Sequence, residues 1–158
     1  MAYLTLQYSD NLVKYLDFEQ ICGSLRLIML DQKIFPEAGV RVKAYPISSY
    51  SIADGHSENA FIDMILRIGV GRSEDQKLKT GEMLMMELEN NVKKLLKTEY
   101  LALALEIIEI DSKFSWKTNP IHKRISAIKK HGKKGCQNLR TIKKNFLHFW
   151  KGLGKVVF

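Results

Sequence analysis

Apolar and polar residues follow two different periods along residues 1–50. Residues 2–8 (AYLTLQY) alternate singly and favour extended backbone, so they predict a β-strand. Residues 9–11 (SDN) interrupt this pattern with side chains that can cap a helix. Residues 40–50 alternate singly again, and Pro46 indicates an edge position or a bulge in this second strand. Between the strands, apolar residues mostly three and four apart predict a helix with one buried face: Leu12, Val13, Leu16, Ile21, Cys22, Leu25, Ile28 and Met29.

The same order of elements recurs along residues 60–110. Residues 60–69 (AFIDMILRIG) predict a third strand, and residues 101–110 (LALALEIIEI) predict a fourth. The helix between them begins at Ser73, which precedes Gln76 at the spacing of a capping box. Its apolar residues step by three and four: Leu78, Gly81, Met85, Leu88, Val92 and Leu95. The two strand–helix–strand units start about 58 residues apart, so the second half repeats the first.

A strand–helix–strand crossover of this length normally joins parallel strands through a right-handed connection. We therefore predict an α+β fold, a β-α-β duplication with one four-stranded, mainly parallel sheet and both helices on one face. The other sheet face would stay uncovered. Apolar strand residues suggest that this face is not wholly polar: Leu4, Leu6, Leu66, Ile68, Leu103 and Leu105. Because such faces are usually buried by self-association, we expect a homo-oligomer.

The composition limits the class of protein. A chain of 158 residues with 46% hydrophobic and 27% charged residues can form one globular domain with an extension. No run approaches the ~18 uncharged apolar residues of a transmembrane helix. The first ten residues lack the basic and apolar regions of a secretory signal. Two cysteines make neither a disulfide framework nor a metal-binding set, so we expect a cytoplasmic protein.

The formal net charge of +8 is concentrated at one end of the chain. Residues 123–158 carry eleven Lys and Arg and no acidic residue, whereas residues 1–122 carry 14 basic and 17 acidic residues. This asymmetry confines any argument from the overall charge to the C-terminal part. We therefore predict a folded domain over residues 1–125 and a basic C-terminal extension over residues 126–158.

The extension itself has two parts. Basic pairs between glycines predict a linker over residues 126–138. Residues 139–153 (LRTIKKNFLHFWKGL) predict a cationic amphipathic helix with aromatic anchors. Three roles remain open for this segment: an extension that the fold does not need, contact with an anionic membrane, and docking on a neighbouring subunit. Nucleic-acid binding is disfavoured because no recognition fold accompanies the charge.

Few side chains indicate a functional site by themselves. Arg72 follows a glycine turn and suggests a solvated turn residue, and Arg41 suggests an exposed edge charge. The segment Gly69-Val70-Gly71 is too short for a dinucleotide fingerprint. Cys22 lies on an apolar helix face, where an unreactive thiol is expected. The histidines show no metal-binding spacing: His56, His122, His131 and His148.

Seven short segments gain meaning from their order and spacing: YSDNL (8–12), IFPEAGVR (34–41), ADG (53–55), GVGRS (69–73), GEML (81–84), LALALEI (101–107) and NPIH (119–122). Together they resemble the 5-carboxymethyl-2-hydroxymuconate isomerase family of the tautomerase superfamily over about residues 2–125. The resemblance implies a cytoplasmic homotrimeric enzyme of aromatic-acid breakdown. Such an enzyme shifts a double bond in an unsaturated keto or dienol acid. Its base is the amine of an N-terminal proline, and it needs no metal or cofactor.

The resemblance also implies the site residues. Ala2 takes the place of the proline, and we expect Met1 to be removed because alanine is small. The pKa of an α-amine lies near ~7.7–8.0, and burial and nearby cations lower it toward a useful value for a base. Arg41 and Arg72 match family arginines that would hold carboxylate and carbonyl oxygens of the substrate and stabilise the dienolate. Lys43 stands where a close relative carries a second arginine, and it keeps the charge without the planar fork.

Two functional classes therefore remain open. The first is an isomerase that moves a proton by a 1,3- or 1,5-shift on an unsaturated di- or tricarboxylic acid. The second is a catalytically impaired trimeric scaffold whose cationic tail binds a membrane or a protein partner, because Ala2 supplies no secondary amine. A retained Met1 would displace the amine by ~3.3–3.6 Å, which should prevent proton transfer at the intended carbon.

Overall fold

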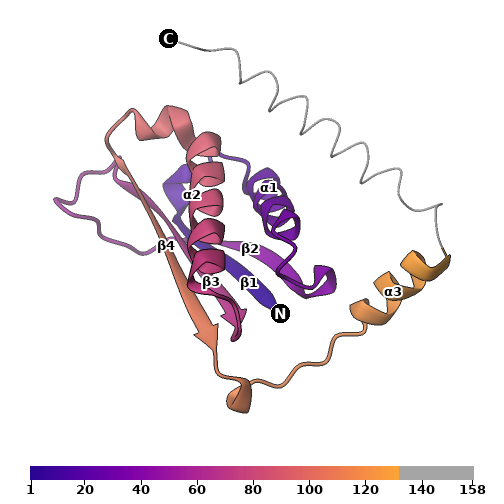
Figure 1. Cartoon of the computed structure of the whole chain (residues 1–158). Coiled ribbons are helices and arrows are strands. Elements are labelled where there is room, and N and C mark those ends of the chain that lie inside the picture. Colours follow the sequence, from indigo (N-terminus) through magenta and orange to yellow (C-terminus); the bar gives the residue numbers. More distant parts are fainter. Residues whose placement is uncertain (132–158) are drawn as a thin grey trace, which may run out of the picture. The chain divides into compact units, whose positions relative to one another are not determined.

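Figure 1 shows the computed structural model, which describes residues 1–131. By internal contacts the chain divides into two units, Met1–Asn119 and Pro120–Phe158, which we describe separately. In the first unit one four-stranded sheet has the strand order β2-β1-β3-β4. The strands are β1 (Ala2–Ser9), β2 (Val40–Ile47), β3 (Ala60–Gly69) and β4 (Leu101–Ile110). The helices α1 (Phe18–Asp31) and α2 (Glu74–Leu96) cover one face of the sheet (Figure 1). The predicted α+β architecture is confirmed.

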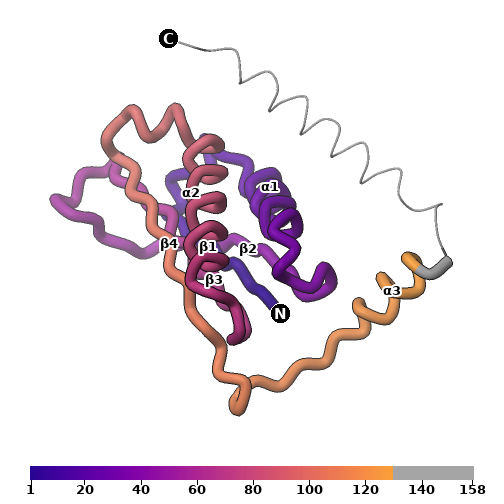
Figure 2. Tube along the Cα trace, viewed as in Figure 1, coloured from indigo at the N-terminus to yellow at the C-terminus, as the bar shows by residue number. Residues whose placement is uncertain are grey.

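The sheet consists of two parallel pairs joined at its centre by an antiparallel pair. Strands β1 and β2 run parallel, as do β3 and β4, and each pair is connected through one helix. Strands β1 and β3 are antiparallel neighbours, with Ala2 opposite Ile68 and Tyr8 opposite Ile62. Both crossovers therefore agree with the expectation of a mainly parallel sheet. The antiparallel centre places the start of β1 beside the end of β3, and the N-terminus lies there (Figure 2).

The core fills the space between the sheet and the two helices. Alternate residues of β1 and β3 are buried there together with one face of each helix. The predicted capping box of α2 is present, because the Ser73 Oγ accepts from the Gln76 N–H and the Gln76 side chain accepts from the Ser73 N–H. Pro46 lies in β2 at the sheet edge, as predicted.

The first helix begins later than the sequence pattern predicted. Residues Asp10–Leu12 form a 3₁₀ turn, and α1 starts at Phe18. Its N-cap is Asp17, whose carboxylate accepts from the Glu19 N–H at 2.9 Å and from the Gln20 N–H at 3.1 Å. Leu12 is nevertheless buried, which explains why it fitted the apolar pattern of the helix. The second strand is also shorter than predicted and ends at Ile47.

The sequence pattern predicted the wrong residues for the uncovered face of the sheet. Leu4, Leu6, Leu66 and Ile68 are buried on the helix side, and Leu103 and Leu105 lie on that side opposite Ile62 and Met64. Because strand side chains alternate, the uncovered face carries the intervening residues. One row across it consists of Arg41, Tyr3, Arg67 and Ile108, and the next consists of Lys43, Thr5, Ile65 and Glu106. This face is therefore mixed, with charged residues at half of these eight positions.

The second unit begins with the helix α3 (Ile121–His131). The linker predicted over residues 126–138 is therefore helical as far as His131, and the rest of it lies outside the described residues. The amphipathic helix predicted over residues 139–153 also lies outside them. None of the helices within residues 1–131 combines the length and apolar content that crossing a bilayer requires.

Candidate active site

The N-terminus is held at the centre of one sheet end. Ala2, the first residue of β1, is opposite Val40 of β2 and Ile68 of β3, and its side chain is fully buried. Met1 rests against the turn that precedes β2. A Cβ atom on Gly39 would lie only 3.2 Å from the Met1 Cα, so a glycine leaves the room that the chain's first residue occupies. The start of the chain is thus fixed on both sides.

Burial and positive charge both lower the pKa of the terminal amine. The pKa of the Met1 amino group is lowered from its ordinary value of 8.0, first by burial and then by Lys117, Arg72 and Arg41. Each effect disfavours the ammonium form, because desolvation and neighbouring cations both raise the free energy of a positive charge. The amine is consequently neutral over a wider pH range than a solvated one. A neutral amine can accept a proton.

Arg72 is anchored by the backbone. Its Nη1 donates to the Gly69 carbonyl at 2.8 Å and to the Val70 carbonyl at 3.3 Å, and its Nη2 donates to the Ile34 carbonyl at 3.1 Å. Its guanidinium also lies over the Phe35 ring at 5.6 Å. These bonds connect the turn after β3 to the loop before β2. Arg72 therefore combines a structural role with a fixed positive charge near the amine.

Arg41 is the more available of the two arginines. Its side chain is exposed on β2, and its guanidinium lies 5.2 Å from the centre of the Tyr3 ring. Its hydrogen-bond partner is the Met1 sulfur, which Nη2 approaches to 3.3 Å, and sulfur is a weak acceptor. Arg41 makes no ion pair among the described residues. A carboxylate that displaced the Met1 side chain would find a planar donor fork beside the amine.

Lys43 is not brought to the amine within one chain. It lies two residues beyond Arg41 on the same face of β2, opposite Thr5 of β1. Its Nζ lies over the Tyr45 ring at 5.4 Å, and Lys43 does not contribute to the lowered pKa of the amine. The substrate-binding role of Lys43 stays a prediction.

The sequence reasoning missed two residues of the segment that follows β4. The Asn119 amide donates to the Ala38 carbonyl at 2.7 Å, which ties this segment to the turn beside Met1. Lys117, two residues earlier, has the largest charge effect on the pKa of the amine. The motif that begins at Asn119 supported the family resemblance, but nothing in its pattern indicated that the preceding lysine would reach the N-terminus.

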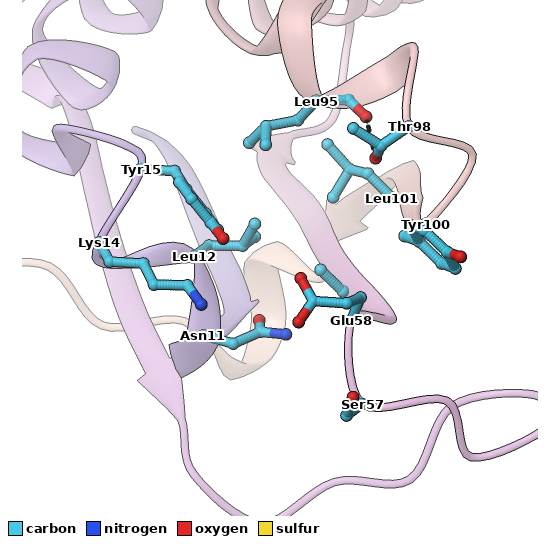
Figure 3. A pocket seen from close by; sticks show the side chains of 11 residues that line it. Asn11, Leu12, Lys14, Tyr15, Ser57, Glu58, Leu95, Thr98, Tyr100 and Leu101 are labelled. Atoms are coloured by element: carbon cyan, nitrogen blue, oxygen red, sulfur yellow. Dashed lines mark hydrogen bonds between the residues drawn. The ribbon is translucent and has the colours of Figure 1, made fainter.

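A separate cavity lies at the other end of the sheet. Figure 3 shows this pocket of about 290 Å³, which is lined by Asn11, Lys14, Tyr15, Glu58, Tyr100 and Leu101 among others. These residues follow the end of β1 or adjoin the starts of β3 and β4, so the pocket is remote from the amine. Lys14 and Glu58 bring opposite charges to its wall, unlike the three cations at the N-terminus. We therefore place the candidate active site at the N-terminus.

Two other titratable groups with shifted pKa values do not indicate an active site. Burial raises the pKa of the Cys22 thiol, which leaves it protonated and unreactive at neutral pH. Burial also raises the pKa of Asp63, a carboxyl group on the uncovered face of β3. Within residues 1–131, no three His, Cys, Asp or Glu side chains gather closely enough to hold a metal ion.

Comparison with known proteins agrees with this geometry. The family model of 5-carboxymethyl-2-hydroxymuconate isomerase matches residues 2–125. The chain belongs to this isomerase family. A relative in Escherichia coli, a 5-carboxymethyl-2-hydroxymuconate Delta-isomerase, is 30% identical over 122 residues, which cover 77% of this chain and 97% of the relative. The predicted family is confirmed.

Two solved structures from the same family have the same fold. The 5-carboxymethyl-2-hydroxymuconate isomerase of Deinococcus radiodurans R1 superposes with a TM-score of 0.74 at 36% identity, covering 78% of this chain and 93% of that one. A crystal structure of a 5-carboxymethyl-2-hydroxymuconate delta-isomerase gives a TM-score of 0.73 at 30% identity, covering 79% and 93%. The tautomerase-type isomerase that the sequence predicted is therefore supported by sequence and by fold.

The effect of Lys117 on the pKa of the terminal amine can be measured directly. Replacing Lys117 with Gln removes a repelling cation, so the pKa of the Met1 amine should rise toward 8.0 in a chain that keeps Met1. The rate of N-terminal acylation by acetic anhydride against pH, followed by mass spectrometry of the terminal peptide, gives this pKa. The matched control is Lys113→Gln, because Lys113 lies on the same segment and does not act on the amine. Equal pKa values in the two variants would contradict the assignment.

Proposed function

We propose that this chain is a cofactor-free isomerase that uses the amine of Ala2, exposed by removal of Met1, as its base. Its substrate is an unsaturated di- or tricarboxylic acid from the breakdown of aromatic compounds, of the kind named for its relatives, 5-carboxymethyl-2-hydroxymuconate. The reaction is a keto–enol change by a 1,3- or 1,5-proton shift. The observation that carries the proposal is the partly buried amino terminus beside Arg41, Arg72 and Lys117, which lower its pKa together with burial.

Removal of Met1 would create both the base and the room for a substrate. The new amine would belong to Ala2, which is fully buried between Val40 and Ile68, so burial would continue to lower its pKa. The side chain of Met1 now occupies the position next to the Arg41 guanidinium. Its departure would leave that guanidinium free to bind a carboxylate in a bidentate manner.

The cations would then serve two purposes in the reaction. They keep the amine neutral before proton transfer, and they stabilise the negative charge that develops as the dienolate forms. Arg72 is suited to the second task because three carbonyls fix its position and little reorganisation is needed. Arg41 is suited to holding a carboxylate. The catalytic role of Ala2 and Arg72 and the binding role of Arg41 and Lys43 form part of this proposal.

We further propose that the enzyme is a cytoplasmic homotrimer. The uncovered sheet face combines charged residues with half-buried Tyr3, Ile65 and Ile108. A groove of about 660 Å³ also lies between α2 and the edge strand β4, with Leu78, Met85, Leu105 and Ile107 in its wall. Apolar surface of this extent favours burial against another copy of the chain.

The starting residue of the chain should determine activity. Two preparations from a cleavable fusion, one beginning at Ala2 and one at Met1, differ only in the position of the amine. We expect the Ala2 form to ketonise 5-carboxymethyl-2-hydroxymuconate on the order of 10²-fold faster, since proton transfer is sensitive to such a displacement. Ultraviolet absorbance follows the dienol, and Ala2→Pro should raise the rate further. Equal rates in the two forms, or no turnover in either, would refute the isomerase proposal and leave the scaffold hypothesis.

The assembly state is tested by the mass of the particle in solution. Sedimentation equilibrium should give three times the chain mass of 18.2 kDa. Because the groove is apolar, a charge placed within it, as in Leu105→Glu, should shift the equilibrium toward single chains. Glu89→Gln, at an exposed position of α2 outside this groove, serves as a comparison. A wild-type chain that remains monomeric at assay concentrations would contradict the trimer.

A further inference from the structure

The pocket at the end of the sheet opposite the amine has no part in the proposed isomerase reaction. Its volume of about 290 Å³ lies at the lower end of the ~300–1,000 Å³ that is usual for small-molecule sites. Part of its wall is apolar, because Leu12 and Ala60 are buried there and Leu95 and Leu101 are half-buried. A pocket of this size and lining can hold the apolar part of a small molecule.

Two charges of opposite sign lie at the rim of this pocket. Figure 3 shows Lys14 and Tyr15 on one side of it and Glu58 and Tyr100 on the other. Within residues 1–131, neither Lys14 nor Glu58 takes part in an ion pair. The Lys14 Nζ instead lies over the Tyr15 ring, 4.8 Å from its centre. The pocket therefore offers a cation to a ligand carboxylate and an anion to a ligand ammonium group.

The side of the pocket that carries Glu58 is held by contacts within the loop before β3. The Glu58 N–H donates to the His56 Nδ1 at 3.2 Å, and the His56 ring stacks on the Tyr100 ring with 4.7 Å between their centres. The Asn59 amide donates to the Asp54 carboxylate at 2.8 Å. These contacts position the Glu58 backbone and the Tyr100 ring before a ligand arrives, which lowers the entropic cost of binding.

The pocket wall also contains a polar atom without a partner. The Asn11 Nδ2 donates to the Asn59 carbonyl at 3.0 Å, which distinguishes the amide nitrogen from the oxygen. The Asn11 Oδ1 is shielded from solvent and accepts no hydrogen bond among the described residues. A buried acceptor without a donor is unfavourable, and a ligand N–H group is the donor that would satisfy it.

We propose that this pocket binds a small zwitterion with an apolar or aromatic body, as in an apolar α-amino acid. The ligand carboxylate faces Lys14, and its ammonium group faces Glu58 and Asn11. Its body lies against the apolar wall between Tyr15 and Tyr100, where a ring can pack on a ring. Because the pocket and the amine lie at opposite ends of β1, the ligand does not contact the proposed active site. The proposal does not depend on isomerase activity.

Isothermal titration calorimetry of the full-length chain with three related probes tests the proposal. L-phenylalanine carries both charges, 3-phenylpropanoate lacks the ammonium group, and 2-phenylethylamine lacks the carboxylate. We expect L-phenylalanine to bind with a dissociation constant of ~10⁻⁵–10⁻³ M, and each of the other two to bind about fivefold or more weakly.

Variants of the two charged residues assign each charge of the ligand. Lys14→Gln should weaken binding of L-phenylalanine and 3-phenylpropanoate about fivefold without weakening that of 2-phenylethylamine. Glu58→Gln should weaken binding of L-phenylalanine and 2-phenylethylamine without weakening that of 3-phenylpropanoate. Both residues are exposed, so neither change should disturb the fold, which circular dichroism verifies. The matched controls are Lys94→Gln and Glu89→Gln at exposed positions of α2 outside the pocket, and they should bind as the wild type does.

Three results would overturn the proposal. The first is the absence of saturable binding of L-phenylalanine up to ~10 mM. The second is equal affinity for the three probes, or equal weakening by the α2 controls, because the charges at the rim would then have no role. The third is loss of L-phenylalanine binding in Arg41→Gln with binding retained in Lys14→Gln, which would place the ligand at the amine instead.

Discussion

The proposed chemistry depends on one unfavourable arrangement that the fold imposes: the first amino group of the chain is partly buried beside three cations. A terminal ammonium normally prefers water, and here burial, Lys117, Arg72 and Arg41 all act against its charged form. The arrangement persists because the amine lies at the head of a central strand. Ala2 is paired in the sheet between β2 and β3, so the residue next to the terminal amine is held in place. The useful result is an amine that loses its proton more readily than a solvated one.

The two arginines near the amine differ in what holds them. Arg72 uses its donors on the carbonyls of Gly69, Val70 and Ile34, so its charge is positioned before any ligand arrives. Arg41 is exposed and donates to a sulfur, which is a weak acceptor. Its N–H groups can therefore bind a stronger acceptor with little loss of hydrogen-bond energy. Such a pair provides one preorganised charge and one adaptable clamp. This difference also means that substitution of Arg72 alters the turn as well as the site.

Much of the fold and part of the candidate site could be predicted from the sequence. Single alternation and steps of three and four identified every strand and the two helices that cover the sheet, because the core side of each element repeats regularly. The helix α3 was missed, because its basic pairs and the glycines that follow were interpreted as a linker. The start of α1 was predicted too early, because Leu12 is buried in a 3₁₀ turn and its spacing fits the apolar pattern of the helix. The uncovered face was misread because the pattern does not say which side of a strand the helices cover. The sequence did not indicate Lys117, because its effect on the pKa of the amine depends on the fold. The segment that carries Lys117 is far from the N-terminus in sequence, and the hydrogen bond from Asn119 to Ala38 connects it to the turn beside Met1.

The most direct test of the account is titration of the amine in the chain that begins at Ala2. Selective ¹⁵N labelling of alanine allows the pKa of the terminal amine to be read by nuclear magnetic resonance, for comparison with the acid limb of kcat/KM against pH. The account predicts one pKa in both measurements, below the ~8.0 of a solvated amine, because the neutral amine is the base. An acid limb that does not coincide with the titration of the amine would contradict the central claim.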